Sequence, residues 1–131
     1  MELRKKQFKY KGQAIEELQK LDVREFSKIV KSGNRRNILR NFQKHEEFIA
    51  LAKKRIENKK QIRTHIRDLV ITPQLVGMRL NIYNGNKFVP VDITGDMLGH
   101  KFGEFAPTRA KIMHSKSGVG ATKGSKVISK K

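Results

Sequence analysis

Apolar and polar residues alternate on both sides of Asn84-Gly85, and this alternation constrains the fold more than any other feature. Residues 78–83 read Met-Arg-Leu-Asn-Ile-Tyr, and residues 88–93 read Phe-Val-Pro-Val-Asp-Ile. A period of two is typical of a strand with one buried face. Asn-Gly tolerates the positive φ angles of a tight hairpin turn. The sequence therefore predicts a β-hairpin over residues 78–93.

The register of this hairpin has a consequence for its proline. If Tyr83 opposes Asn86, one face of the hairpin is apolar along its whole length. The same register places Pro90 opposite Arg79, at a pair where the partner strand requires a donor that proline lacks. We therefore expect a bulge or a break in pairing at Pro90.

Three further segments are expected to complete the sheet region. Residues 63–68 also alternate, which predicts a third strand with Arg63 and His65, together with Arg67, on one cationic face. Residues 72–77 and 94–99 each begin with a threonine that can cap a helix and end with a glycine. These two segments predict single helical turns that pack against the sheet.

The region before the sheet predicts helices. Asp22 and Glu25 have capping-box spacing ahead of an apolar stripe that stops before Gly33, an expected helix-terminating glycine. A second helix is expected over about residues 43–59, and residues 32–37 between the two helices are expected to form a basic connector. The apolar side of the second helix would consist of Phe48, Leu51, Ala52 and Ile56.

Positive charge is spread unevenly along the 131 residues, whose formal net charge is +18. Residues 1–62 carry a net charge of +10, residues 63–110 of +2, and residues 111–131 of +6. We expect a basic helical region over 1–62, packed on a compact core over 63–110. The tail over 111–131 has too few apolar residues to offset the entropy of ordering, so we expect it to be disordered when free.

Several classes of function find no support in the sequence. There is no cysteine, no apolar run long enough to span a membrane, and no signal-peptide pattern. The histidines lack paired ligand spacing, no phosphate-binding glycine loop is present, and Asp96 and Glu104 have local explanations. We therefore expect a soluble, intracellular protein that is not an enzyme and needs no cofactor or metal. A polyanionic partner is favoured, which leaves a free-standing nucleic-acid-compacting protein as an alternative.

Individual side chains are open to two interpretations. Lysines on helix faces, such as Lys59 and Lys60, are most often solvated, whereas cations held on a strand can direct their donors at phosphates. Tyr83 and Phe88 lie on the polar face of the hairpin and could either pack locally or stack on bases. Core packing is expected for the other aromatic residues considered, Phe8, Tyr10, Phe102 and Phe105.

The segment from Asn84-Gly85-Asn86 to Pro107-Thr108-Arg109 resembles the small-subunit ribosomal protein nineteen family. It contains Asn-Gly, a downstream aliphatic-Gly pair, and Phe102-Gly103-Glu104-Phe105 followed by Thr108. The match is tight over about residues 60–122 and looser over 13–59. Four segments are similar to the archaeal and eukaryotic branch of the family: residues 8–12, 63–68, 72–77 and 118–122.

The resemblance implies an α/β (α+β) fold, with a three-stranded mixed or antiparallel sheet and packed helices. It also implies a cytoplasmic structural constituent of the small ribosomal subunit that binds ribosomal RNA in the subunit head. Such a protein would pair with small-subunit protein thirteen and direct its tail toward the tRNA sites. The RNA-binding residues expected on this basis are Arg35, Arg36, Arg40, Arg63, His65, Arg67, Arg79, Asn84, Gly85, Lys87, His100, Lys101, Arg109, Lys111, His114, Lys116, Lys123 and Lys126.

Overall fold

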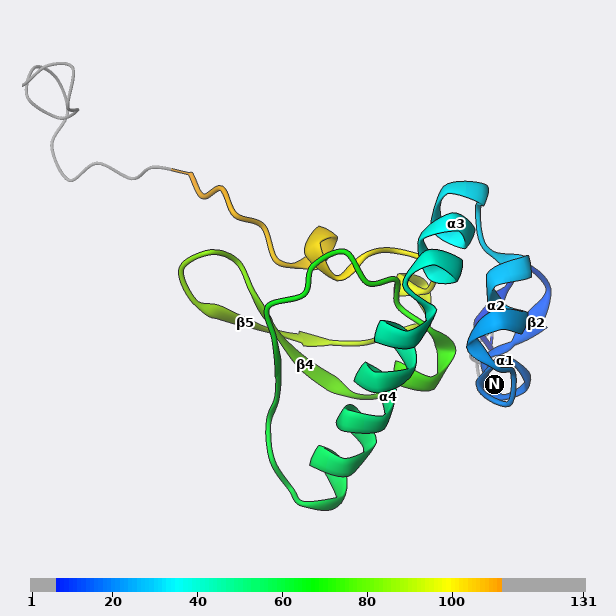
Figure 1. The fold of residues 1–131 in the computed structure, drawn as a ribbon, viewed down its shortest axis with the longest axis horizontal. Helices are drawn as coiled ribbons and strands as arrows, with labels where there is room; N and C mark the ends of the chain where they lie inside the picture. Colours follow the sequence, from blue (N-terminus) through cyan, green and yellow to red (C-terminus); the bar gives the residue numbers. More distant parts are fainter. Residues whose placement is uncertain (1–6, 112–131) are drawn as a thin grey trace, which may run out of the picture.

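Helices, short 3₁₀ turns and a small sheet build an α+β fold, as expected (Figure 1). The structure, a computed structural model, describes residues 7–111. The N-terminal part contains a short antiparallel pair and four helices, and the remainder contains three strands and three 3₁₀ helices (η1–η3). In chain order the elements are β1 (Lys9–Tyr10), β2 (Gln13–Ala14), α1 (Ile15–Gln19), α2 (Val23–Ile29), α3 (Ser32–Arg40), α4 (Phe42–Glu57), β3 (Ile62–Thr64), η1 (Pro73–Leu75), β4 (Arg79–Tyr83), β5 (Phe88–Asp92), η2 (Gly95–Met97) and η3 (Phe102–Phe105).

The main sheet is three-stranded and mixed, in the order β3-β4-β5. β3 runs parallel to β4, and β5 runs antiparallel to it. The third strand begins at Ile62, one residue before the predicted start, and ends at Thr64, earlier than expected. The Thr64 hydroxyl accepts a hydrogen bond from the Ile66 backbone N–H at 3.1 Å, which turns the chain out of the strand.

The predicted hairpin forms, but its register differs by two residues from the expected one. Tyr83 pairs with Phe88 rather than with Asn86. The Asn84 side chain causes the difference, because its Oδ1 accepts hydrogen bonds from the N–H groups of Asn86 and Lys87. The tip is therefore Gly85-Asn86, with Gly85 at φ +96°. Since the shift is an even number of residues, the same side chains still face the core.

The expected bulge at Pro90 is wrong, because the ladder continues through it and pairs Pro90 with Asn81. Backbone hydrogen bonds join Asn84 N to Lys87 O and Ile93 N to Met78 O. These bonded pairs alternate with unbonded ones, and Pro90 falls at an unbonded pair. Its nitrogen therefore faces the open edge of the sheet, where no partner strand needs a donor.

The first helices follow the predicted capping box and then depart from the expected layout. Asp22 and Glu25 form the box at the start of α2, as predicted. Residues 32–37 are not a connector and Gly33 does not end a helix, because both lie within α3. Tertiary contacts account for this helix: Ile38 is fully buried, and two of its asparagine side chains bond to distant carbonyls.

α4 matches the expected second helix to within two residues at each end. Two members of its predicted apolar side, Phe48 and Ala52, are buried. The other two are exposed, Leu51 by 42% and Ile56 by 47%. The buried stripe instead includes Ile49 and His45, so the helix presents a face rotated from the predicted one.

Both predicted single turns form, as η1 and η2. Leu75 and Leu98 are buried, as expected. The threonine side chains do not cap these turns, however. Thr72 is buried and its hydroxyl has no hydrogen-bond partner among the described residues.

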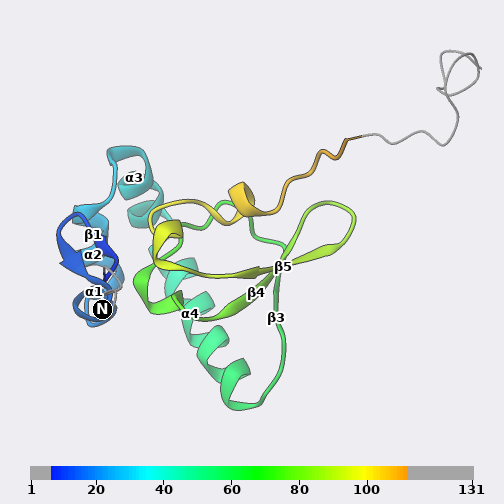
Figure 2. The same cartoon turned by 180° about the vertical axis from the view of Figure 1, so that it is seen from behind.

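The core lies between the inner face of the sheet and the helices. α4 lies against one face of the sheet, and the chain turns at the end of this helix to enter β3 (Figures 1 and 2). The sheet therefore has one covered face and one open face. Leu80 and Ile82 are fully buried on the covered face, and Phe102 stacks edge-on against Phe48 at 5.2 Å between ring centroids. Tyr10 packs near Phe26, and burial raises its pKa. In residues 7–111 no helix is long and apolar enough to cross a membrane.

Candidate nucleic-acid interface

The open face of the sheet, called here the outer face, carries side chains in three rows. The strand pairing places Arg63, Asn81 and Pro90 side by side in the middle row. The alternation of β3 continues beyond its two ends, so Gln61 and His65 point to the same side. All members are exposed or half-buried. The rows are Gln61, Arg79 and Asp92; Arg63, Asn81 and Pro90; and His65, Tyr83 and Phe88.

The third row, called here the aromatic row, consists of His65, Tyr83 and Phe88. Its ring centroids lie 4.6 Å apart for His65 and Tyr83, 5.1 Å for His65 and Phe88, and 5.2 Å for Tyr83 and Phe88. The Arg63 guanidinium lies over Phe88, 5.5 Å from the ring centroid. Aromatic rings and cations thus occupy one accessible surface.

The cations of the outer face have few partners. Arg63 donates a hydrogen bond to the Gln61 side chain at 3.1 Å. Arg79 lies 3.5 Å from the Asp92 carboxylate, in a pair whose side chains are 67% and 75% exposed. Such an exposed ion pair holds its partners weakly. Both guanidinium groups are thus accessible to a polyanion.

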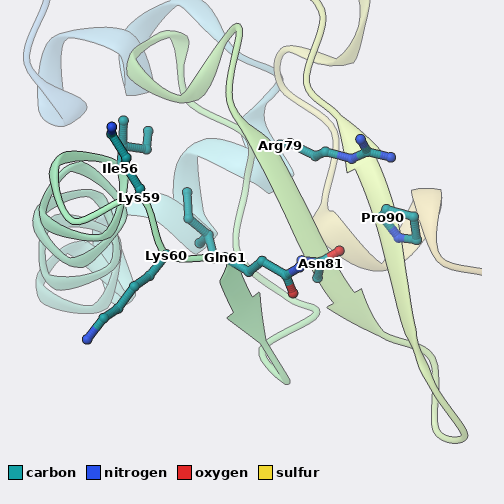
Figure 3. A pocket seen from close by; sticks show the side chains of 8 residues that line it. Ile56, Lys59, Lys60, Gln61, Arg79, Asn81 and Pro90 are labelled. Atoms are coloured by element: carbon teal, nitrogen blue, oxygen red, sulfur yellow. The ribbon is translucent and has the colours of Figure 1, made fainter.

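A groove of about 570 Å³ borders the outer face beside Arg79, Asn81 and Pro90 (Figure 3). Its other wall comes from the end of α4 and the segment after it, which contributes Lys59 and Lys60. Lys59 adopts φ +53°, a conformation uncommon for a side-chain-bearing residue. The sequence alone indicates solvated side chains for both lysines. Nothing in their local pattern signals the groove, which arises from the parallel pairing of β3 with β4.

The hairpin tip adds exposed groups next to the aromatic row. Gly85 and Lys87 are exposed, whereas Asn84 is half-buried and its side chain closes the turn. The Tyr83 hydroxyl donates to the Gly85 carbonyl at 3.1 Å. Two of the three predicted tip residues therefore face solvent, and the third shapes the tip.

Arg67 does not share the outer face with Arg63 and His65, contrary to the predicted strand. Its guanidinium donates to the carbonyl oxygens of Tyr83 at 2.6 Å, Gly103 at 2.9 Å and Ala106 at 2.6 Å. These contacts, called here the Arg67 cluster, join the end of β4 to the chain around η3. Contact between Arg67 and RNA stays a prediction, and the structure gives this residue an intramolecular role.

The arginines of α3 divide in the same way. Arg35 donates to the carbonyls of Ser27 and Lys28 at the end of α2, at 3.0 and 2.9 Å. Arg36 and Arg40 are exposed. Asn34 donates to the Gly99 carbonyl, which places α3 beside the loop that carries the next candidates.

That loop presents His100 and Lys101. His100 Nδ1 lies 2.7 Å from a Glu104 carboxylate oxygen, and the other oxygen accepts the Lys101 backbone N–H at 3.4 Å. Glu104 therefore pairs with a neighbouring cationic group when His100 is protonated, consistent with its local interpretation. Arg109 and Lys111 are exposed. The remaining predicted RNA contacts lie outside the described residues: His114, Lys116, Lys123 and Lys126.

In Figures 1 and 2 the chain from about residue 99 to 111, coloured yellow to orange, runs from beside α3 toward the β4–β5 hairpin. Within residues 7–111 the charged side chains form two ion pairs, Arg79–Asp92 and His100–Glu104. In this part of the chain, most cations are thus not neutralised by carboxylates.

The fourth histidine is an internal structural residue. His45 is buried, accepts the Val70 N–H at Nε2 at 3.1 Å, and lies 2.9 Å from the Asn41 carbonyl through Nδ1. Burial lowers the pKa of its imidazole. Among the described residues, no group of three or more His, Asp or Glu side chains could hold a metal ion.

Comparison with known protein families matches residues 30–114 to Ribosomal protein S19. The matched segment contains α3, α4, the whole main sheet and the loop after it, and thus nearly all of the candidate interface. Members of this family are structural rather than catalytic components of the ribosome. Because the match spans well over half of the 131 residues, the chain belongs to the ribosomal protein S19 family and is a ribosomal protein of the small subunit.

Proposed function

We propose that this protein binds small-subunit ribosomal RNA in the head of the subunit. The observation that carries the proposal is the set of outward, largely unneutralised cations in the described part of a chain of this family. Three surfaces supply them: the outer face with its groove, the hairpin tip, and α3 with the loop over residues 99–111. Phosphates of a folded RNA are the partner that such a surface fits.

Recognition would depend mainly on the shape and phosphate geometry of the RNA. Arg63 and Arg79 are carried by paired strands, so their guanidinium groups start from a fixed backbone and can bind phosphate oxygens bidentately. Contacts of this kind fix orientation without reading base sequence. Folded RNA, with a groove that side chains cannot easily read, is recognised largely in this way.

The proposed partners follow from the resemblance in residues 84–109. They are ribosomal RNA, small-subunit protein thirteen, and tRNA near the basic tail over 111–131. We also propose that the chain belongs to the archaeal and eukaryotic branch of the family, as indicated by residues 63–68 and 72–77. No enzymatic activity is proposed, since neither the sequence motifs nor the described side chains suggest a reaction.

Sedimentation tests the assignment to the particle and its RNA. The tagged full chain is expected to co-migrate with small subunits in a sucrose gradient, and to remain bound to small-subunit RNA after mild removal of other proteins. A pool at the top of the gradient would contradict the proposal. Equal affinity for DNA and RNA would instead support the compacting alternative.

A charge substitution tests the candidate surface. Lys101→Ala is expected to weaken binding to a small-subunit RNA fragment and to reduce the salt slope of binding by about 0.7–0.9. Lys53→Ala, which removes an exposed lysine from α4, is the matched control and should leave the slope unchanged. An unchanged slope for Lys101→Ala would remove this residue from the interface.

A further inference from the structure

Aromatic side chains on a small domain are mostly buried, so an exposed aromatic row needs an explanation. Phe102 and Phe26 show the usual situation, with no exposed surface. Tyr83 and Phe88 are only half-buried, and His65 is exposed. The three rings meet on the open face of the sheet, where among the described residues the Arg63 guanidinium lies over Phe88.

Sheet stability explains only part of this row. Tyr83 and Phe88 are direct cross-strand neighbours, and such pairs stabilise a hairpin. His65 follows the end of β3 and does not belong to that pair. Within residues 7–111 its imidazole has no hydrogen-bond partner, although it lies within about 5 Å of both other rings. A polar ring placed in this way leaves one side available to another planar group.

The surroundings of the row favour a negatively charged ligand that carries such a planar group. Arg63 lies over Phe88, and Lys87 is exposed one residue before it. Among the side chains of the three rows, the one carboxylate is that of Asp92, which lies in the opposite row and pairs with Arg79. A nucleotide combines a planar base with a phosphate and matches both features.

We propose that the aromatic row of His65, Tyr83 and Phe88 stacks on an unpaired base of RNA, with Arg63 and Lys87 on the flanking phosphates. This inference rests on the proposed function and names the part of the RNA that the outer face binds. An unpaired base is required, because the faces of paired bases are covered by their neighbours in a helix.

The dimensions of the face suit a short single-stranded segment. Arg79 and Tyr83 are four residues apart on β4, which corresponds to roughly 13 Å along the strand. A strand of RNA that begins on the aromatic row can therefore continue past Arg63 toward Arg79. The groove lined by Lys59 and Lys60 lies at that end of the face.

Aromatic proton NMR of the full chain tests the stacking. The probes are a short uridine oligomer and an abasic ribose-phosphate chain of the same length and charge. We expect the uridine oligomer to shift the ring resonances of His65, Tyr83 and Phe88, and the abasic chain to leave them nearly unchanged. The buried ring of Phe102 serves as the internal reference.

Affinity measurements with variants provide the second arm. The uridine oligomer should bind about tenfold more tightly than the abasic chain, a factor typical of base stacking on aromatic residues. The double variant His65→Ala, Phe88→Leu leaves only Tyr83 in the row, so it should strongly reduce this preference and retain the affinity for the abasic chain. Phe8→Leu, which changes a 39% exposed aromatic residue outside the three rows of the outer face, is the matched control and should preserve the preference.

The outcomes separate this inference from the proposed function. Equal binding of both chains would overturn the stacking proposal while leaving RNA binding through phosphates intact. Failure of both chains to bind, together with failure to bind the small-subunit RNA fragment, would overturn both. An undiminished preference in the double variant would show that the base binds elsewhere, and would overturn the assignment to this row.

Discussion

The outer face of the sheet and the irregular segments around it use arginine in opposite ways. Arg63 on β3 points outward and its guanidinium has one side-chain acceptor, whereas Arg67, four residues later, donates to three backbone carbonyls. The difference lies in the supply of acceptors. Carbonyls in a sheet are largely used by the ladder, but irregular chain leaves carbonyls that need donors. At these two positions, the arginine on the strand is therefore available to a ligand, whereas the one beside irregular chain is held by the fold.

The helical region follows the same rule. The end of α2 leaves carbonyls without helical partners, and Arg35 donates to two of them. Arg36, the next residue, is exposed. Two adjacent arginines thus have different roles: Arg35 binds backbone carbonyls of the fold, whereas Arg36 is exposed to solvent. The difference depends on which carbonyls lie near each side chain.

The largest expected effect comes from breaking the Arg67 cluster. Arg67→Ala should lower the free energy of unfolding by about 3 kcal/mol, because three carbonyls lose a charged donor. Arg63→Ala should change it by less than about 0.5 kcal/mol, as expected at an exposed site. Urea unfolding of the full chain measures both, and similar losses for the two variants would refute the distinction.

Arg67→Lys sharpens this prediction by keeping the charge. A single ammonium group cannot reproduce the spread of a guanidinium fork over three acceptors, so most of the stability loss should remain. Full recovery with lysine would indicate that charge, rather than hydrogen-bond geometry, stabilises the cluster.

Arg63→Ala, which is expected to change stability little, should have a clear effect on RNA binding. Arg63→Ala is expected to weaken binding to a small-subunit RNA fragment about three- to tenfold and to reduce the salt slope by about 0.7–0.9. The fold should be unaffected, so the loss would report on contact alone. Retention of full affinity by this variant would mean that outward orientation on the strand does not identify a contact residue.

The buried histidine His45 is expected to make the stability of the protein depend on pH, with a smaller effect. Burial lowers the pKa of His45 below its ordinary value of 6.5, so the folded state binds a proton less readily than the unfolded chain. The stability due to neutral His45 is complete above about pH 6.5 and is lost as the pH falls from there through the lowered pKa. Protonation would also place an N–H at Nε2, which now accepts from Val70.

Urea unfolding at pH 7.5 and pH 5 checks this prediction. His45→Gln removes the titrating group and keeps an acceptor, so it should lose less stability on acidification than the parent chain. A parent-like pH dependence for His45→Gln would assign the effect to other groups.

The smallest predicted effect tests the corrected helix boundaries. Gly33→Ala should raise the free energy of unfolding by about 0.5 kcal/mol, because Gly33 lies in α3 and a Cβ added there would meet open space. Gly99→Ala should destabilise, since φ is +77° and a Cβ would lie 2.8 Å from the Tyr10 hydroxyl. Destabilisation by Gly33→Ala would instead indicate that Gly33 ends a helix with a positive φ angle, as the sequence pattern predicts.

Patterns in the sequence predict the elements better than the details of their pairing. The period of two identifies β4, β5 and their buried face, because burial of alternate residues is a local property of a strand. The register depends on a side chain, Asn84, that competes with the backbone in the turn. Local patterns do not reveal α3, because Asn34 and Asn37, residues with modest helix propensity, are held there by partners far away in the chain.

The same division applies to the candidate site. Arg63 and His65 could be placed on one face from the sequence, because side chains two residues apart on a strand point to the same side. Lys59 and Lys60 could not be placed in the groove, because β3 must first pair in parallel with β4 to create it. The role of Arg67 depends on carbonyls up to 39 residues away, which no local pattern encodes.

Pro90 lies in the middle of β5, on the unpaired edge of the sheet. Its ring occupies the position where an added strand would need a backbone N–H donor. A second copy of the chain that approached this edge would find its hydrogen-bonding row interrupted at the centre. Pairing of two copies along β5 is therefore disfavoured. The proline that leaves the hairpin itself undisturbed would in this way keep unassembled copies apart.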